Sequence, residues 1–143
     1  MPENYVATVE SIYAALARRD VQFVLDRMDP KVEWHSAENF IYAHGNPYLG
    51  QEAVRKGIFD RLFEEWTEFL LIPQEILGAG DVVIARGRYR GTFKGTGYAL
   101  DAQFVHVFRF KDGKIIMGQT YTDTAQFRDA VNRVRTTGVL AAT

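Results

Sequence analysis

Acid–base chemistry in this sequence could start from His106, the single ionisable side chain on one face of the segment 100–110. Bulky apolar residues alternate there with mostly polar ones, which is the pattern of a β-strand with one buried face. Burial lowers the pKa of a histidine and leaves a neutral imidazole, which can donate or accept a proton. His106 is therefore a candidate acid/base or oxyanion donor. The alternative is a structural histidine whose hydrogen bonds are satisfied by Tyr13 or a backbone carbonyl.

Tyr13 is the second candidate for catalysis. Residues 3–18 repeat apolar side chains at helical spacing, and Tyr13 lies on the apolar face of that helix. Its hydroxyl could donate to the same ligand oxygen as His106. A tyrosine there is also typical of a core in which the hydroxyl finds a partner.

A proton acceptor could come from the connection 37–50, which is long and rich in aromatic residues. Loops of this length in compact domains are often lids or binding loops. His35, Glu38 and His44 lie in or beside it, and among them we prefer Glu38 as the catalytic base. The alternative is that all three are solvated.

Several aromatic residues are candidates for the walls of an apolar ligand pocket, and the same residues would equally fill an ordinary core. Trp34 stands on one face of a predicted strand, 31–36, and we expect it to form an apolar wall. The others are Tyr48, Phe59, Tyr89, Phe104 and Phe108.

The turn after residue 110 determines which side chains join His106. A two-residue turn at Asp112-Gly113 would put the odd-numbered residues 117–121 on its face. A three-residue loop that starts at Lys111 would instead put the even-numbered residues 116–122 there, including Thr120. The residues alone leave both registers open, because a shift of one residue reverses the face.

Length and composition exclude several classes of protein. The 143 residues suit one domain, 1–143, with a core of about 5–132 and a frayed tail from Thr136. A net charge of −1 favours neither nucleic acid nor an anionic membrane, and without cysteine there is no disulfide or thiol chemistry. No signal peptide or membrane-length apolar run is visible, so we expect a cytoplasmic protein. The histidines lack metal-ligand spacing and the glycines of 91–97 lack a phosphate-loop ending, so we expect no cofactor and no metal.

The order of elements predicts an α+β fold. Helical periodicity covers residues 3–18 and 51–66, and a shorter helix capped by Asp20 lies between them. Strand periodicity then covers 70–77, 82–93 and the central hairpin, before a last helix that begins at Asp123 or Thr124. Helices followed by a run of antiparallel strands indicate a sheet with one face covered by helices.

This order, with the segments PYLGQEAVRKGIFDRL, GRYRGTFKGTG and FVHVFRFKDGKI, resembles the nuclear-transport-factor-2-like superfamily, in its SnoaL-like and ketosteroid-isomerase-like branch. The resemblance covers about 5–132. It implies a curved antiparallel sheet wrapped by N-terminal helices into a cone, also called cystatin-like, around an apolar pocket. It also implies a homodimer through the outer sheet face, and it favours the three-residue turn.

The resemblance implies roles for individual residues. Ketosteroid isomerases have a tyrosine within one residue of Tyr13 and an acid where His106 stands, whereas their base falls at Trp34. SnoaL-type polyketide cyclases have a histidine at His106, and both they and limonene-epoxide-hydrolase-like proteins have an aspartate at Thr120. One carboxylate of each enzyme type therefore has no counterpart here. We expect a cofactor-independent isomerase, cyclase or dehydratase acting on an apolar carbonyl compound. The alternative is a non-catalytic apolar-ligand binder or a dimeric scaffold.

Overall fold

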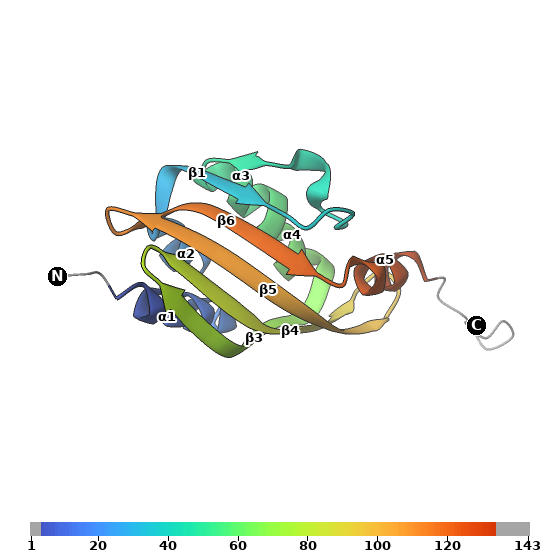
Figure 1. Ribbon diagram of the computed structural model, residues 1–143. Helices are drawn as coiled ribbons and strands as arrows, with labels where there is room; N and C mark the ends of the chain where they lie inside the picture. The colour runs from blue at the N-terminus through green and yellow to red at the C-terminus, as the bar shows by residue number, and fades with distance from the viewer. Residues whose placement is uncertain (1–3, 134–143) are drawn as a thin grey trace, which may run out of the picture.

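A computed structural model describes residues 4–133 as a six-stranded sheet with most helices on one side (Figure 1). The helices are α1 (Tyr5–Ala17), α2 (Val21–Asp26), η1 (Ala43–Gly45), α3 (Gln51–Val54), η2 (Arg55–Phe59), α4 (Asp60–Glu65) and α5 (Thr124–Asn132). The strands are β1 (Met28–His35), β2 (Tyr48–Leu49), β3 (Trp66–Ala79), β4 (Val82–Phe93), β5 (Ala99–Lys111) and β6 (Lys114–Thr122). The predicted α+β class is confirmed. The tail predicted from Thr136 lies outside the described residues.

The sheet is open and mixed, in the order β2-β1-β6-β5-β4-β3. Every neighbouring pair is antiparallel except β1 and β6, which run parallel, so the sheet expected to be antiparallel is mixed at that pair. Periodicity cannot reveal this pairing, because β1 and β6 are far apart in the sequence. β1 also begins three residues before its predicted start, since the amide of Ile115 in β6 already donates to the Arg27 carbonyl, at 2.9 Å.

Side-chain caps begin three of the helices. The carboxylates of Asp20 and Asp123 accept from the backbone amides of Phe23 and Gln126, and Asn4 caps α1 in the same way. The cap predicted at Asp20 is confirmed, and α5 begins where the sequence predicted, with Asp123 as its cap.

The hairpin between β5 and β6 has the two-residue turn, so the three-residue loop was the wrong choice. Lys111 pairs with Lys114, and Asp112 and Gly113 both have positive φ, at 51° and 83°. The even-numbered residues nevertheless face His106 from Gly118 onward, because a bulge at Ile116 shifts the register: Phe110 pairs with Ile115, but Arg109 pairs with Met117. The bulge restores the face that the turn alone would have reversed.

The segment 51–66 is less regular than its helical pattern predicted. A π-helical turn, η2, separates α3 from α4, and Trp66 begins β3 instead of ending the helix. The long connection 37–50 also contains the short strand β2, whose pairing with β1 ties it to the sheet edge.

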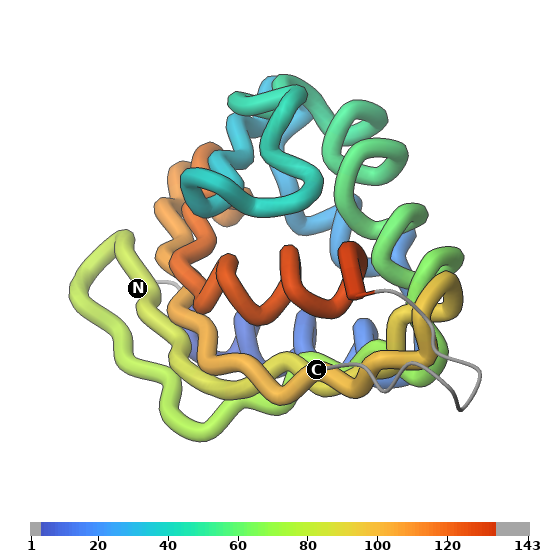
Figure 2. Tube along the Cα trace, turned by 90° about the vertical axis from the view of Figure 1, so that its right-hand side faces the viewer, coloured from blue at the N-terminus to red at the C-terminus, as the bar shows by residue number. Residues whose placement is uncertain are grey.

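The core lies between the concave face of the sheet and the helices. Figure 2 shows α5 crossing one end of the space between the curved strands and the α3–α4 segment. The predicted inner face of β5 is buried throughout, at Leu100, Ala102, Phe104, His106, Phe108 and Phe110. His106 therefore sits in the middle of an apolar layer.

Candidate functional site

Two tyrosines hold the imidazole of His106 in the core. The Tyr13 hydroxyl, from α1, lies 2.6 Å from Nδ1, and the Tyr89 hydroxyl, from β4, lies 2.6 Å from Nε2. Only 4% of His106 is exposed, and both tyrosines are buried. The sequence suggested the contact between His106 and Tyr13, but it predicted Tyr89 only as a residue of the pocket wall. The missed signal is the β4–β5 register: Ala85 of β4 pairs with His106, and Tyr89 lies four residues further along β4.

Burial keeps all three side chains neutral. It lowers the pKa of His106 to about 3, because no anion offsets the cost of charging the ring. Burial likewise raises the pKa of Tyr13, with an added contribution from Tyr89. It also raises the pKa of Tyr89, against a smaller opposite effect of a hydrogen bond with Thr120. At neutral pH the cluster is an uncharged chain of hydrogen bonds.

The hydrogen-bond partners assign the tautomer of His106. The bond with Thr120 lowers the pKa of Tyr89, so Thr120 donates and the Tyr89 oxygen accepts. Tyr89 then donates to Nε2, and Nδ1–H donates to the Tyr13 oxygen. This arrangement leaves the Tyr13 proton for a molecule in the cavity that Tyr13 lines.

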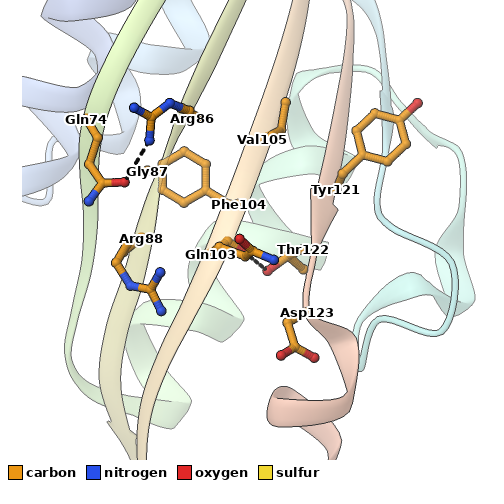
Figure 3. Close-up of a pocket in the computed structure, with 10 residues that line it drawn as sticks. All are labelled: Gln74, Arg86, Gly87, Arg88, Gln103, Phe104, Val105, Tyr121, Thr122 and Asp123. Atoms are coloured by element: carbon orange, nitrogen blue, oxygen red, sulfur yellow. Dashed lines mark hydrogen bonds between the residues drawn. The ribbon is translucent and has the colours of Figure 1, made fainter.

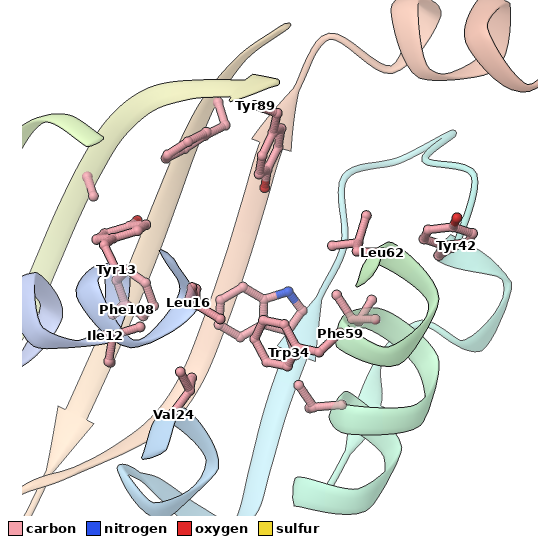
Figure 4. Close-up of a cluster of buried hydrophobic side chains, with 14 of the residues drawn as sticks. Ile12, Tyr13, Leu16, Val24, Trp34, Tyr42, Phe59, Leu62, Tyr89 and Phe108 are labelled. Carbon is pink, nitrogen blue, oxygen red and sulfur yellow. The ribbon is translucent and has the colours of Figure 1, made fainter. Parts of the chain in front are cut away.

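The cluster borders an internal cavity of about 40 Å³. This volume admits a water molecule or two, whereas ligand sites have volumes of roughly 300 Å³ or more. The polar residues of its wall are Tyr13, Tyr89, His106 and Thr120, and the others are Ile12, Leu16, Val24, Met28, Trp34, Val54, Ile58, Phe59, Leu62, Leu71 and Phe108. In Figure 4, Trp34 lies between side chains of α1 and those of the η2–α4 segment. A larger ligand therefore requires these side chains to move apart.

Trp34 lies flat on the sheet because β6 has a glycine beneath it. A Cβ atom at Gly118 would lie 2.0 Å from Trp34 Cζ3 and 2.2 Å from Cε3. Gly118 pairs with Trp34 across β1 and β6. The glycine thus sets the position of the indole at the cavity.

We expect Gly118→Ala to push the indole into the cavity and to lower the free energy of unfolding by about 1–3 kcal/mol, the usual cost of overpacking. Urea denaturation would measure the loss. Gln119→Ala, on the opposite face of the same strand, should cost less than about 0.5 kcal/mol. Equal stability of Gly118→Ala and the wild type would contradict this account of Trp34.

The predicted wall residues divide into two groups. Trp34, Phe59, Tyr89, Phe108 and Thr120 line the cavity, together with Tyr13 and His106. Phe104 lies just outside the cavity wall and stacks on the imidazole, with ring centroids 4.2 Å apart. Tyr48 is buried elsewhere: its hydroxyl donates to the Tyr42 carbonyl, and its ring lies against the backbone of η2 at Gly57.

The three candidate bases of the loop lie away from this cavity wall. Glu38 and His44 are exposed, and His44 belongs to η1. Glu38 and His35 border a separate surface hollow with Asn46 and Tyr121. His35 Nε2 lies 3.8 Å from the Glu33 carboxylate and is buried without a hydrogen-bond partner. A catalytic role for Glu38 stays a prediction, and it would require the loop to move over the cavity.

The outer sheet face carries a second hollow, open to solvent, with a volume of about 550 Å³. Figure 3 shows Arg86 and Arg88 along β4 on one side of it and Tyr121 of β6 on the other. The arginines form cross-strand ion pairs, Arg86 with Glu75 at 2.7 Å and Arg88 with Asp101 at 2.6 Å. The homodimer predicted through this face stays a prediction.

Comparison with known proteins places the fold in a family. A family model described as the SnoaL-like domain matches residues 9–118. This chain belongs to the SnoaL-like family. Its fold also resembles an NTF2-like protein from Burkholderia thailandensis, with 31% identity, a TM-score of 0.84, and coverage of 89% of this chain and 96% of that one. The superfamily resemblance inferred from the sequence is thereby confirmed.

Two further structures resemble this SnoaL-like domain. TerC, co-crystallised with polyporic acid, has 28% identity and a TM-score of 0.75 over 86% of this chain and 96% of TerC. A putative SnoaL-like polyketide cyclase from Jannaschia sp. has 20% identity and a TM-score of 0.74 over 88% and 90%, and shares the fold. No curated protein matches the chain. Within residues 4–133, no helix is long and apolar enough to span a membrane.

Proposed function

We propose that this SnoaL-like domain is a cofactor-independent enzyme, of the isomerase or cyclase kind, whose substrate is a small, mostly apolar carbonyl compound. The observation that carries the proposal is the Tyr13–His106–Tyr89 cluster, a hydrogen-bonded polar group at the wall of an otherwise apolar cavity. An ordinary core would bury three apolar rings at these positions without needing partners for polar atoms.

The cluster suits a reaction in which negative charge develops on an oxygen. Tyr13 and Tyr89 stay protonated because burial raises their pKa values, so their hydroxyls remain donors at neutral pH. Donors fixed in apolar surroundings stabilise an oxyanion more strongly than water-exposed donors do. A carbonyl oxygen in the cavity beside Tyr13 would receive such a hydrogen bond.

A non-catalytic ligand-binding protein is the second candidate, and one observation favours it. The wall of the cavity contains no carboxylate, lysine or arginine among the described residues. Without a strong base, the same cavity would hold an apolar ligand and leave it unchanged. That TerC was co-crystallised with polyporic acid is compatible with either candidate.

An aromatic 1,3-diketone, benzoylacetone, distinguishes the candidates. We expect the diketone to shift the imidazole NMR signals of His106, and the wild type to accelerate conversion of its enol to the ketone, followed by ultraviolet absorbance. Acceleration should be about 10²-fold or more, as for general acid–base catalysis, and His106→Gln should abolish it. Glu64→Gln, on an exposed position of α4, should keep the wild-type rate.

Binding without acceleration would contradict catalysis and support the second candidate. If neither the signals of His106 nor the rate responds to the diketone or to related aromatic ketones, both candidates fail.

A further inference from the structure

We infer that Tyr89 is a catalytic residue alongside Tyr13, and that His106 joins the two hydroxyls into a proton relay that interconverts keto and enol forms. The inference rests on the proposed function and names its substrate class: a carbonyl compound with an acidic C–H group next to the carbonyl. It assigns to a tyrosine the proton transfer for which no carboxylate is available.

The geometry of a relay is present in the structure. The two ring nitrogens of His106 each lie 2.6 Å from a tyrosine hydroxyl, on opposite sides of the imidazole. Both tyrosines also line the cavity, one from α1 and the other from β4. A molecule in the cavity would therefore meet both ends of one hydrogen-bonded chain.

The protons of this chain point in one direction. Thr120 donates to Tyr89, Tyr89 donates to Nε2, and Nδ1–H donates to the Tyr13 oxygen. A substrate carbonyl oxygen in the cavity would become the last acceptor, from the Tyr13 hydroxyl. The Tyr89 oxygen keeps one lone pair for a C–H group at the other end.

The transfer is balanced in atoms and charge. The C–H bond breaks and its proton goes to the Tyr89 oxygen, while the Tyr89 proton moves to Nε2. The Nδ1 proton moves to the Tyr13 oxygen, and the Tyr13 proton moves to the carbonyl oxygen. The C–H electron pair becomes the C=C bond of the enol, and the C=O π pair forms the new O–H bond. His106 changes tautomer and is never charged.

A relay agrees with the surroundings of His106 better than a charged imidazole does. The ring meets Tyr13 of α1, Trp34 of β1, Tyr89 of β4 and Phe104 of β5, with Thr120 of β6 beside Tyr89. Of these groups only the two tyrosines titrate, and neither is an anion at neutral pH. An imidazolium here would lack a counter-charge, whereas a tautomer change needs none.

The test is the rate of benzoylacetone ketonisation as a function of pH, for the wild type, Tyr89→Phe and Tyr13→Phe. We expect a flat wild-type profile between about pH 5 and 7.5, because no group of the relay titrates there. Each phenylalanine variant keeps the ring and should lose about 10²-fold in rate, since either change interrupts the chain. Proton NMR of the variants, with and without the diketone, would confirm that they fold and bind.

The solvent isotope effect separates the relay from a merely structural role of Tyr89. We expect the rate to fall along a curve, and not a straight line, as the fraction of D₂O in the solvent rises, because several protons move together. Full activity of Tyr89→Phe would overturn the relay. An inflection in the wild-type pH–rate profile that Glu38→Gln removes would also overturn it, although catalysis itself would then stand. A wild type without any acceleration would instead overturn the proposed function.

Discussion

Acidification should lower the free energy of unfolding by up to about 5 kcal/mol through His106 alone. The pKa of His106 is about 3 in the folded protein, against 6.5 for the free side chain. Between these pH values the imidazole of His106 binds a proton in the unfolded chain but not in the folded one, so stability falls as the pH falls. The loss begins near the unfolded pKa and is complete below the folded one, and each pKa unit is worth about 1.4 kcal/mol.

Urea denaturation at several pH values between about 7 and 4 would measure this effect. His106→Gln should be less stable than the wild type at neutral pH, because it loses hydrogen bonds to Tyr13 and Tyr89. The difference should shrink on acidification, since glutamine does not titrate. A constant difference across the pH range would show that His106 does not resist protonation.

Replacement of Trp66 by alanine should be the most damaging single change in the apolar core, at about 3–5 kcal/mol. Trp66 begins β3 and is almost fully buried. Its indole contacts the rings of Phe69, Phe93 and Phe127, and its Nε1–H donates to the Tyr42 hydroxyl at 3.2 Å. It therefore joins the sheet, the long connection and α5.

Denaturation midpoints would test this prediction with two comparison variants. Trp66→Phe keeps most of the apolar contact and should lose only part of the stability, whereas Leu77→Ala, at a side chain 56% exposed, should cost less than about 1 kcal/mol. A loss for Trp66→Ala as small as that for Leu77→Ala would mean that the core collapses around the missing indole.

The sequence predicted much of the fold because local patterns carry it. Strict alternation along 100–110 identified β5 and its buried face, and the caps at Asp20 and Asp123 marked helix starts correctly. The resemblance predicted the family and the neighbourhood of Tyr13 and His106. These features depend on side chains a few residues apart or on motifs read along the chain.

The errors have a different physical origin. The turn at Asp112-Gly113 was assigned one residue too long, yet the bulge at Ile116 kept the predicted face. β1 pairs with β6 in parallel, whereas the resemblance implied an antiparallel sheet. Both depend on how distant strands align, and alternation has the same period in either arrangement.

By itself, the sequence determined a histidine on the apolar face of a strand, where burial favours its neutral form. It also indicated a SnoaL-like fold that lacks one catalytic carboxylate of each related enzyme type. Only the tertiary structure showed that Tyr89 occupies the second nitrogen of His106, that the loop bases lie away from the cavity wall, and that Trp34 leaves a volume of about 40 Å³. The hydrogen bond between Tyr13 and His106, 93 positions apart, depends on the packing of α1 against the curved sheet. The one between Tyr89 and His106, 17 positions apart, depends on the register of β4 and β5. No periodicity along the chain encodes these contacts.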